Sequence, residues 1–320
     1  MENRERGFSL IELLVAMTAT LIITGAVFQL VTAGQTAFRK EPALAERQQN
    51  IRVALDVISH DLYRAGYGTP TFAQVFTDGL DGAGAAGSSG QASDILELYT
   101  SAECGPVPVC DVPGNGSVSM TLVTEISGCY KLPGLVLVAD EEKWAMRWAH
   151  NPGTSASCPA APVGAKNGRV AFPPGKAPLV NPPGGFNGWI PDYMLPGEAI
   201  RYRINPDASG NPNLERSAFG GQTDLDGNST WEVIARGIED LQVEYQNGVG
   251  WQDEPGATAP NGWDTIIRRV RVRLSARVVG GGQMAGESTS AVGTAVRGQL
   301  ETEVAPRPAA IALGMQRGDL

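Results

Sequence analysis

The sequence predicts an α+β protein in which one long N-terminal α-helix packs on an antiparallel β-rich globular head. Two patterns lead to this fold class. Residues 8–66 carry an uncharged apolar run that passes into a helical stripe of apolar side chains. After Tyr67 the chain alternates between polar and apolar residues in short segments, separated by stretches rich in Gly and Pro. The second pattern is typical of strands joined by turns and long loops.

The first element is an apolar segment of membrane-spanning length. No residue is charged from Leu13 to Phe38, and about 20 apolar residues suffice to cross a bilayer. Glu12 stands at the start of this run, and a carboxylate inside a membrane is costly unless it has a partner. A secretory signal would end its apolar core at a small-residue cleavage site, whereas this run continues without a clear break. The pattern therefore favours a retained helix over a removed signal.

The helix is predicted to continue beyond the membrane as an amphipathic segment over 39–66. One face of this segment carries an apolar stripe formed by Leu44, Ile51, Leu55, Ile58 and Leu62. Pro42 is expected to kink the helix or to open it briefly. Gly66 and Gly68 are its expected stop signals. The stripe should pack on the head, which we assign to 67–306, with a tail over 307–320.

The head is predicted to be built from strands. Alternating segments lie at 94–101, 119–127, 134–149 (a possible hairpin), 198–206, 214–219, 265–279 and 295–306. Residues 231–247 are expected to form a short turn or helix followed by a strand, and 151–191 to form long loops with strand fragments. In the Arg-rich segment 266–277 the Arg residues should lie on the wet face of a strand. The opposite, core-facing side should carry Ile267, Val270, Val272 and Leu274.

Four cysteines lie in the loop-rich middle of the chain: Cys104, Cys110, Cys129 and Cys158. None forms a CxxC pair and only two histidines exist, which argues against a zinc site. An even number of cysteines fits two disulfides if the head lies outside the cytoplasm. We expect Cys104–Cys110, which would close a short loop, and Cys129–Cys158. Four cysteines allow three connectivities, and free buried thiols are the other interpretation.

The remaining residues give no catalytic set. His60 and His150 lack any nucleophile context and are interpreted as surface or packing residues. Asp224, Asp226 and Asn228 have the spacing of a calcium loop, but Ser229 stands where the loop needs Gly and Ala235 where it needs Glu. Glu232 could replace that Glu if the loop folds differently. Calcium and a solvated turn both remain open there, and no other cofactor is expected. The net charge of −9 argues against nucleic acid as a partner. We therefore expect a protein that is not an enzyme.

The segment "RGFSLIELLVAM" resembles the processing site of type IV prepilins. The resemblance implies a leader of residues 1–7, cleavage between Gly7 and Phe8, N-methylation of Phe8, and a transmembrane and filament-core helix over 8–38. It also implies that Glu12 acts in assembly, because in this family the acid at that position pairs with the N-terminal amine of a neighbouring subunit. A buried pair of opposite charges is far less costly than either charge alone.

The resemblance extends to PilW-type minor pilins through "ALDVISHDLYRAGYG", "ASDILELYT" and the pattern from "AIRYRI" to "IIRRVRVRLSAR", and is patchy over 102–195. It implies a minor pilin in a tip or priming complex. Its partners would be other pilins, the prepilin peptidase/methyltransferase and the inner-membrane assembly platform. The expected location is the inner membrane, with the head outside the cytoplasm, and then the pilus. A J-type minor pseudopilin of type II secretion and a membrane-anchored adhesin are the alternatives.

Overall fold

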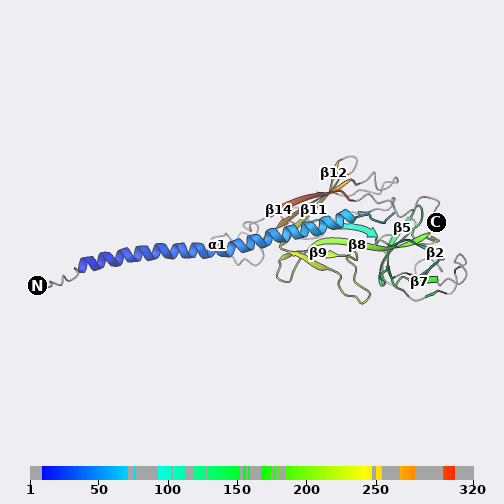
Figure 1. The fold of residues 1–320 in the computed structure, drawn as a ribbon, viewed down its shortest axis with the longest axis horizontal. Coiled ribbons are helices and arrows are strands. Elements are labelled where there is room, and N and C mark those ends of the chain that lie inside the picture. The colour runs from blue at the N-terminus through cyan, green and yellow to red at the C-terminus, as the bar shows by residue number, and fades with distance from the viewer. Residues whose placement is uncertain are drawn as a thin grey trace.

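The computed structural model describes residues 9–70, 75–76, 93–101, 104–111, 119–126, 128–151, 154–155, 158, 167–173, 176, 179, 185–186, 188–246, 250–253, 267–277 and 298–306. A long helix projects from one end of an elongated β-rich head, so the predicted α+β fold class is confirmed (Figure 1). All strand pairs within the two sheets are antiparallel.

The helix α1 spans Leu10–Arg64, and its 55 residues correspond to roughly 80 Å. Pro42 lies inside α1, which continues on both sides of it, so the brief opening expected there does not occur. The predicted stop signals are confirmed. Gly66 and Gly68 follow the helix with φ of 76° and 67°, a backbone region that glycine enters at little steric cost. The chain therefore turns back onto the head directly after the helix.

One sheet centres on β8, the longest strand. Its second half pairs with β1 on one side and β9 on the other, and β9 pairs with β10. These strands are β1 Leu96–Ser101, β8 Tyr193–Pro206, β9 Pro212–Ser217 and β10 Glu232–Arg236. The segments 198–206 and 214–219, both predicted as strands, pair with each other as parts of β8 and β9. Residues 231–247 were expected to form a short turn or helix and then a strand, but the first part of this segment is the strand β10, and Gly237, with φ of 77°, separates it from the next strand.

A second, four-stranded sheet has the order β12-β11-β13-β14. Its strands are β11 Ile238–Gln246, β12 Trp251–Gln252, β13 Arg269–Ala276 and β14 Gly298–Val304. The predicted orientation of β13 is confirmed, because Val270, Val272 and Leu274 are fully buried. On its wet face, Arg271 and Arg273 form ion pairs with Glu301 and Glu303 of β14 and Glu244 of β11.

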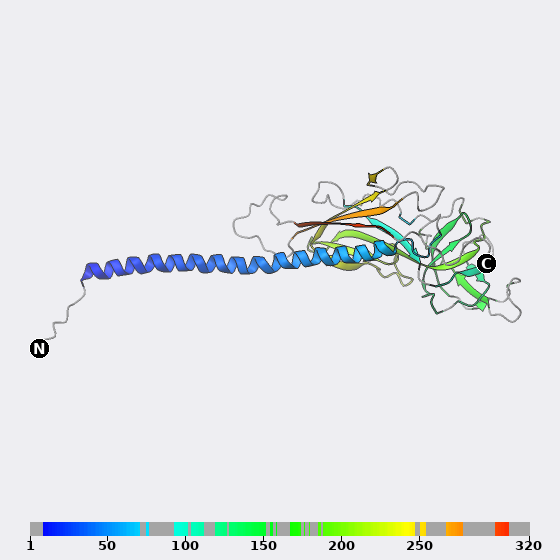
Figure 2. The same ribbon diagram turned by 45° about the horizontal axis from the view of Figure 1, so that its top comes forward.

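The second half of α1 packs between the two sheets. It contacts β10 at the edge of the first sheet, and β13 and the edge strand β14 of the second. Ile51, Ile58 and Leu62 of the predicted stripe are buried here, with Leu55 packed against the same core. Figure 2, turned from the first view, also shows α1 running along the sheets. A helix in this position covers strand edges that would otherwise be open to pairing.

The remaining strands form the end of the head that lies away from the N-terminus. They are β2 Val107–Asp111, β3 Ser119–Leu122, β4 Gly134–Ala139, β5 Trp144–Ala149, β6 Thr154–Ser155 and β7 Asn167–Ala171. The predicted β4–β5 hairpin is confirmed, whereas β2 was not foreseen. All six belong to residues 102–196, which connect Ser101 of β1 to its direct partner Gly197 on β8. Through the pairing of β2 and β4 with the first residues of β8, they belong to the same ten-stranded sheet as β1, β9 and β10. We call residues 102–196 the inserted lobe, and α1 together with the described strands outside 102–196 the proximal lobe.

Candidate processing and assembly segment

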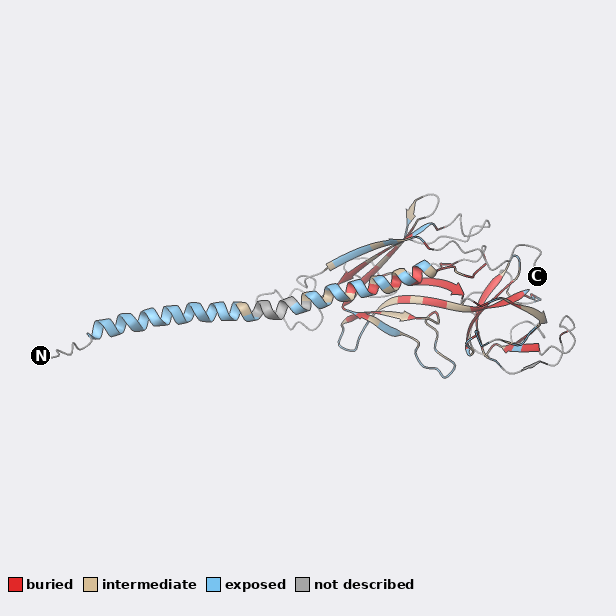
Figure 3. Cartoon of the chain, viewed as in Figure 1, coloured by how far each residue is buried: buried red, intermediate tan, exposed pale blue. Residues whose placement is uncertain are grey.

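The first half of α1 is apolar on every side and uncovered. Within Leu10–Gln35 an 18-residue window reaches a mean hydropathy of 2.1, and by length and composition this stretch can cross a membrane. Leu10, Leu21 and Ile22 each expose more than two thirds of their surface. Figure 3 shows this half of the helix exposed, in contrast with the buried residues of the second half. A helix that is hydrophobic all round needs lipid or other helices around it.

Three threonine hydroxyls within this stretch are satisfied by the helix itself. The hydroxyls of Thr18, Thr20 and Thr32 donate to carbonyl oxygens three or four residues earlier, at 2.7–3.0 Å. Such bonds remove the need for an external acceptor, so these residues are compatible with an apolar surrounding. Among the described residues 9–35, Glu12 is then the one ionisable side chain.

Glu12 lies in the first turn of α1, where Ser9 is the N-cap residue. Its Oε2 accepts a hydrogen bond from the backbone N–H of Ser9 at 3.1 Å. This is the reach-back contact of a capping box, and it places the carboxylate at the positive end of the helix dipole. The carboxylate is exposed, so its second oxygen can face a partner outside this helix. The carboxylate is therefore fixed at the start of the helix, and it can still pair with a positive charge on another subunit.

Comparison with protein families identifies this segment. Residues 3–28 match the family model described as the prokaryotic N-terminal methylation motif. The chain carries a prepilin-type N-terminus. The match spans Gly7, Phe8 and Glu12, of which Gly7 and Phe8 lie outside the described residues. Their roles as cleavage and methylation sites therefore stay predictions.

Among solved structures, the fold is similar to a type IV-like pilin from Thermus thermophilus. The two chains share 12% sequence identity with a TM-score of 0.35, over 82% of this chain and 97% of that chain. No curated protein matches the sequence.

Asp61 holds the second half of α1 to the head, and sequence reasoning missed this role. It is only 3% exposed. Its Oδ2 accepts hydrogen bonds from Arg216 Nε on β9 at 2.7 Å and from Tyr202 Oη on β8 at 2.5 Å. A buried carboxylate is tolerated when it is paired and hydrogen-bonded in this way. One signal was present in the sequence: Asp61 lies three residues after Ile58, on the apolar face.

The pKa values around Asp61 follow from this burial. Burial, and then the neighbouring charge of Asp61, raise the pKa of Tyr202 well above its ordinary value. Burial alone would lower the pKa of Arg216, but the hydrogen bond and charge of Asp61 raise it above the ordinary range. Tyr202 is therefore neutral and Arg216 charged throughout the physiological range. Two donors thus converge on one carboxylate and fix the position of the helix along the head.

The disulfide pairing expected from the sequence is wrong. Cys104 pairs with Cys129 and Cys110 with Cys158, with Cα–Cα distances of 6.2 and 5.8 Å. Cys110 lies on the extended strand β2, where each residue advances the chain by about 3.3 Å. Six residues of largely extended chain carry Cys110 too far from Cys104 for a bridge, which needs Cα atoms within about 7 Å.

The calcium-like loop forms a hydrogen-bonded turn. The carboxylate of Asp224 accepts bonds from the backbone N–H and side-chain amide of Asn228, at 2.7 and 2.9 Å. These bonds from Asn228 lower the pKa of Asp224. The Lys176 ammonium donates to the carbonyl oxygens of Thr223 and Asp224 at 2.7 and 3.0 Å, and so already supplies a cation to the loop. Asp226 is exposed, and the hydrogen bonds of the loop are those of the solvated-turn interpretation.

Neither histidine lies in a catalytic arrangement. The His60 side chain is exposed on α1, with Nδ1 3.8 Å from Asp61 Oδ1. His150 follows β5 and exchanges backbone hydrogen bonds with Ala171. Within the part of the chain that the structure describes, no group of three or more His, Cys, Asp or Glu residues could hold a metal ion. The feature that stands out is therefore α1, with its methylation motif at one end and the head at the other.

Proposed function

We propose that the chain is a minor pilin of the PilW type, which joins a tip or priming complex of a type IV pilus through α1. The observation that carries the proposal is the division of α1 into two halves. Leu10–Gln35 is apolar and uncovered directly after a methylation motif, whereas 51–64 is anchored in the head. Such a helix links a membrane or filament core to a folded head.

Glu12 is the proposed assembly residue. After cleavage between Gly7 and Phe8, each subunit would begin with a methylated amine next to the helix start. In a cluster of apolar helices, that ammonium and the Glu12 carboxylate of a neighbour would compensate each other's desolvation. The pair would also set the register between subunits, because a shift of one helix would leave two charges uncompensated in an apolar surrounding.

The other parts of the proposal follow from the same segment. The prepilin peptidase/methyltransferase would process residues 1–8, and the inner-membrane assembly platform would receive the product. The disulfides favour a head outside the cytoplasm, since they persist in oxidising compartments. We propose a single membrane pass before incorporation into the pilus, and a structural role without catalysis.

The test is recruitment of Glu12 variants. Glu12→Gln removes the charge and keeps the shape, and Glu12→Ala removes both. Both variants should accumulate in the membrane as processed protein, because losing the acid makes insertion easier. Both should co-purify poorly with other minor pilins and should lower the pilus count. The matched control is Glu46→Gln, which changes an exposed Glu further along α1. Normal recruitment of both Glu12 variants, or equal loss in the control, would contradict the proposal.

A further inference from the structure

The inserted lobe enters and leaves the head at one point. Ser101, the last residue of β1, lies directly opposite Gly197 on β8, and the two strands pair continuously from there to Leu96 and Tyr202. Residues directly opposite in an antiparallel pair have Cα atoms about 5 Å apart. The lobe is therefore an excursion from a β-hairpin that would be complete without it.

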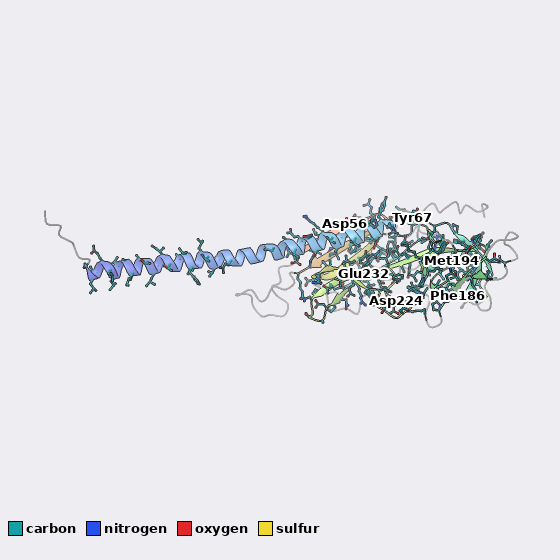
Figure 4. All side chains as sticks on the ribbon, turned by 60° about the horizontal axis from the view of Figure 1, so that its bottom comes forward. Asp56, Tyr67, Phe186, Met194, Asp224 and Glu232 are labelled. Carbon is teal, nitrogen blue, oxygen red and sulfur yellow. A yellow bond between two sulfur atoms is a disulfide. The ribbon has the colours of Figure 1, made fainter. Side chains whose placement is uncertain are left out.

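Two hydrophobic cores follow the same division, and a third one crosses the boundary between the lobes. The core that surrounds α1 contains no residue of the inserted lobe. A second core consists entirely of residues from Cys104 to Met194, all inside the lobe. A unit with its own core can fold by its own contacts. Figure 4 shows Phe186 and Met194 of the second core at one end of the head, away from Asp56 on α1.

The lobe also has its own covalent bonds. Both disulfides join residues within 102–196, and among the described residues no cysteine lies elsewhere. Each would stabilise the lobe by restricting its unfolded chain. The proximal lobe is held instead by the packing of α1, the Asp61–Arg216 pair and the hydrogen bond from Asn50 to the Arg236 carbonyl.

The two lobes share the strand β8, a third core, and the hydrogen bonds from Lys176 to the loop at Thr223 and Asp224. Tyr99 and Ala199 of the proximal lobe pack with residues of β4, β5 and the start of β8. Tyr99 is anchored from its own side as well, because its hydroxyl donates to Glu97, which pairs with Arg201. The β1–β8 pair that carries both residues continues independently of the lobe. Loss of the lobe would therefore expose the third core without removing the strands below it.

We propose that recruitment into the filament resides in α1 and the proximal lobe, and that the inserted lobe is a separately folding module that recruitment does not need. This inference rests on the proposed function. It assigns the interaction surface for neighbouring pilin subunits to α1 and the two sheets around it. The inserted lobe lies at the far end of the head, and its surface does not contact those subunits.

The test compares one residue type in the two cores of the full-length chain. Val138 on β4 and Val272 on β13 are both fully buried, one in each core. An unpaired carboxylate at either site costs several kcal/mol and should open its own core. Val138→Asp should abolish the protection of β4 and β5 from amide hydrogen exchange while leaving α1 and β13 protected, and co-purification with other minor pilins should continue. Val272→Asp should abolish both protection of α1 and recruitment.

A milder variant tests the same inference in case Val138→Asp prevents the protein from accumulating. Cys110→Ser with Cys158→Ser removes one bridge from the lobe and no side chain from the proximal core. It should raise exchange in the lobe and leave α1 and recruitment unchanged. The inference is overturned if Val138→Asp or the cysteine variant loses α1 protection or recruitment, or if both proteins fail to accumulate. If the unaltered chain is itself not recruited, the proposed function fails instead.

Discussion

Removing the Asp61 carboxylate should release the second half of α1 from the head. Asp61→Ala leaves Arg216 without the partner that compensates its burial, and leaves the Tyr202 hydroxyl without its acceptor. Breaking a buried ion pair costs about 3–5 kcal/mol, and because the Arg216 side chain is 20% exposed we expect the lower end, about 3 kcal/mol. The loss should fall on the contact between helix and sheets, because the pair joins α1 to β9.

Amide hydrogen exchange over 51–64 in the detergent-extracted chain measures this opening. A loss of about 3 kcal/mol corresponds to roughly a hundredfold faster exchange, when the exchange rate is proportional to the equilibrium constant for opening. Asp56→Ala, which changes an exposed acid on the same helix, is the control and should change stability by less than about 0.5 kcal/mol. In a double-mutant cycle with Arg216→Ala, the coupling energy should be about 2 kcal/mol. Equal exchange in the two Asp variants, or a coupling near zero, would refute the role assigned to Asp61.

Two further predictions concern the inserted lobe and its junction with the proximal lobe. Partial burial, and then the charges of Asp140 and Glu141, raise the pKa of Asp192. The folded chain therefore holds this proton more tightly, and stability falls as pH rises from the ordinary pKa of 3.8 through the folded-state value. Asp192→Asn should be more stable than the unaltered chain near neutral pH, with the difference vanishing well below pH 3.8; a constant difference in urea midpoints would contradict this. Separately, a Cβ at Gly197 would collide with Met146, so Gly197→Ala should cost about 1–3 kcal/mol. Combining it with Met146→Ala should cost less than the two changes summed, and simple additivity of the urea midpoints would show that the collision is absent.

Local patterns were enough to predict α1 and most strands. The apolar stripe through Ile51, Ile58 and Leu62 follows the helical period, and the alternation of β13 follows the period of a strand. Both periods are set by backbone geometry within a few residues, so they can be recognised from one sequence. The start of the apolar run and Glu12 were identified by a motif that the family comparison supports.

Contacts between distant residues could not be predicted in the same way. Asp61 and Arg216 are 155 residues apart, and the sequence around Asp61 does not indicate which residue pairs with it. The cysteine pairing failed for a related reason, because proximity in sequence was taken as proximity in space although β2 is extended. The two-lobed head depends on the pairing of Ser101 with Gly197 across the whole inserted lobe. Each of these features requires the tertiary fold.

The most direct test of the central claim is the intact mass of the chain purified from membranes, with sequencing of its N-terminal peptide. We predict that residues 1–7 are absent, that the chain begins at Phe8, and that the new N-terminus carries one methyl group. The same spectrum should fit four oxidised cysteines. A chain that retains residues 1–7, or that is cut beyond the apolar run, would contradict the interpretation of this protein as a processed pilin subunit.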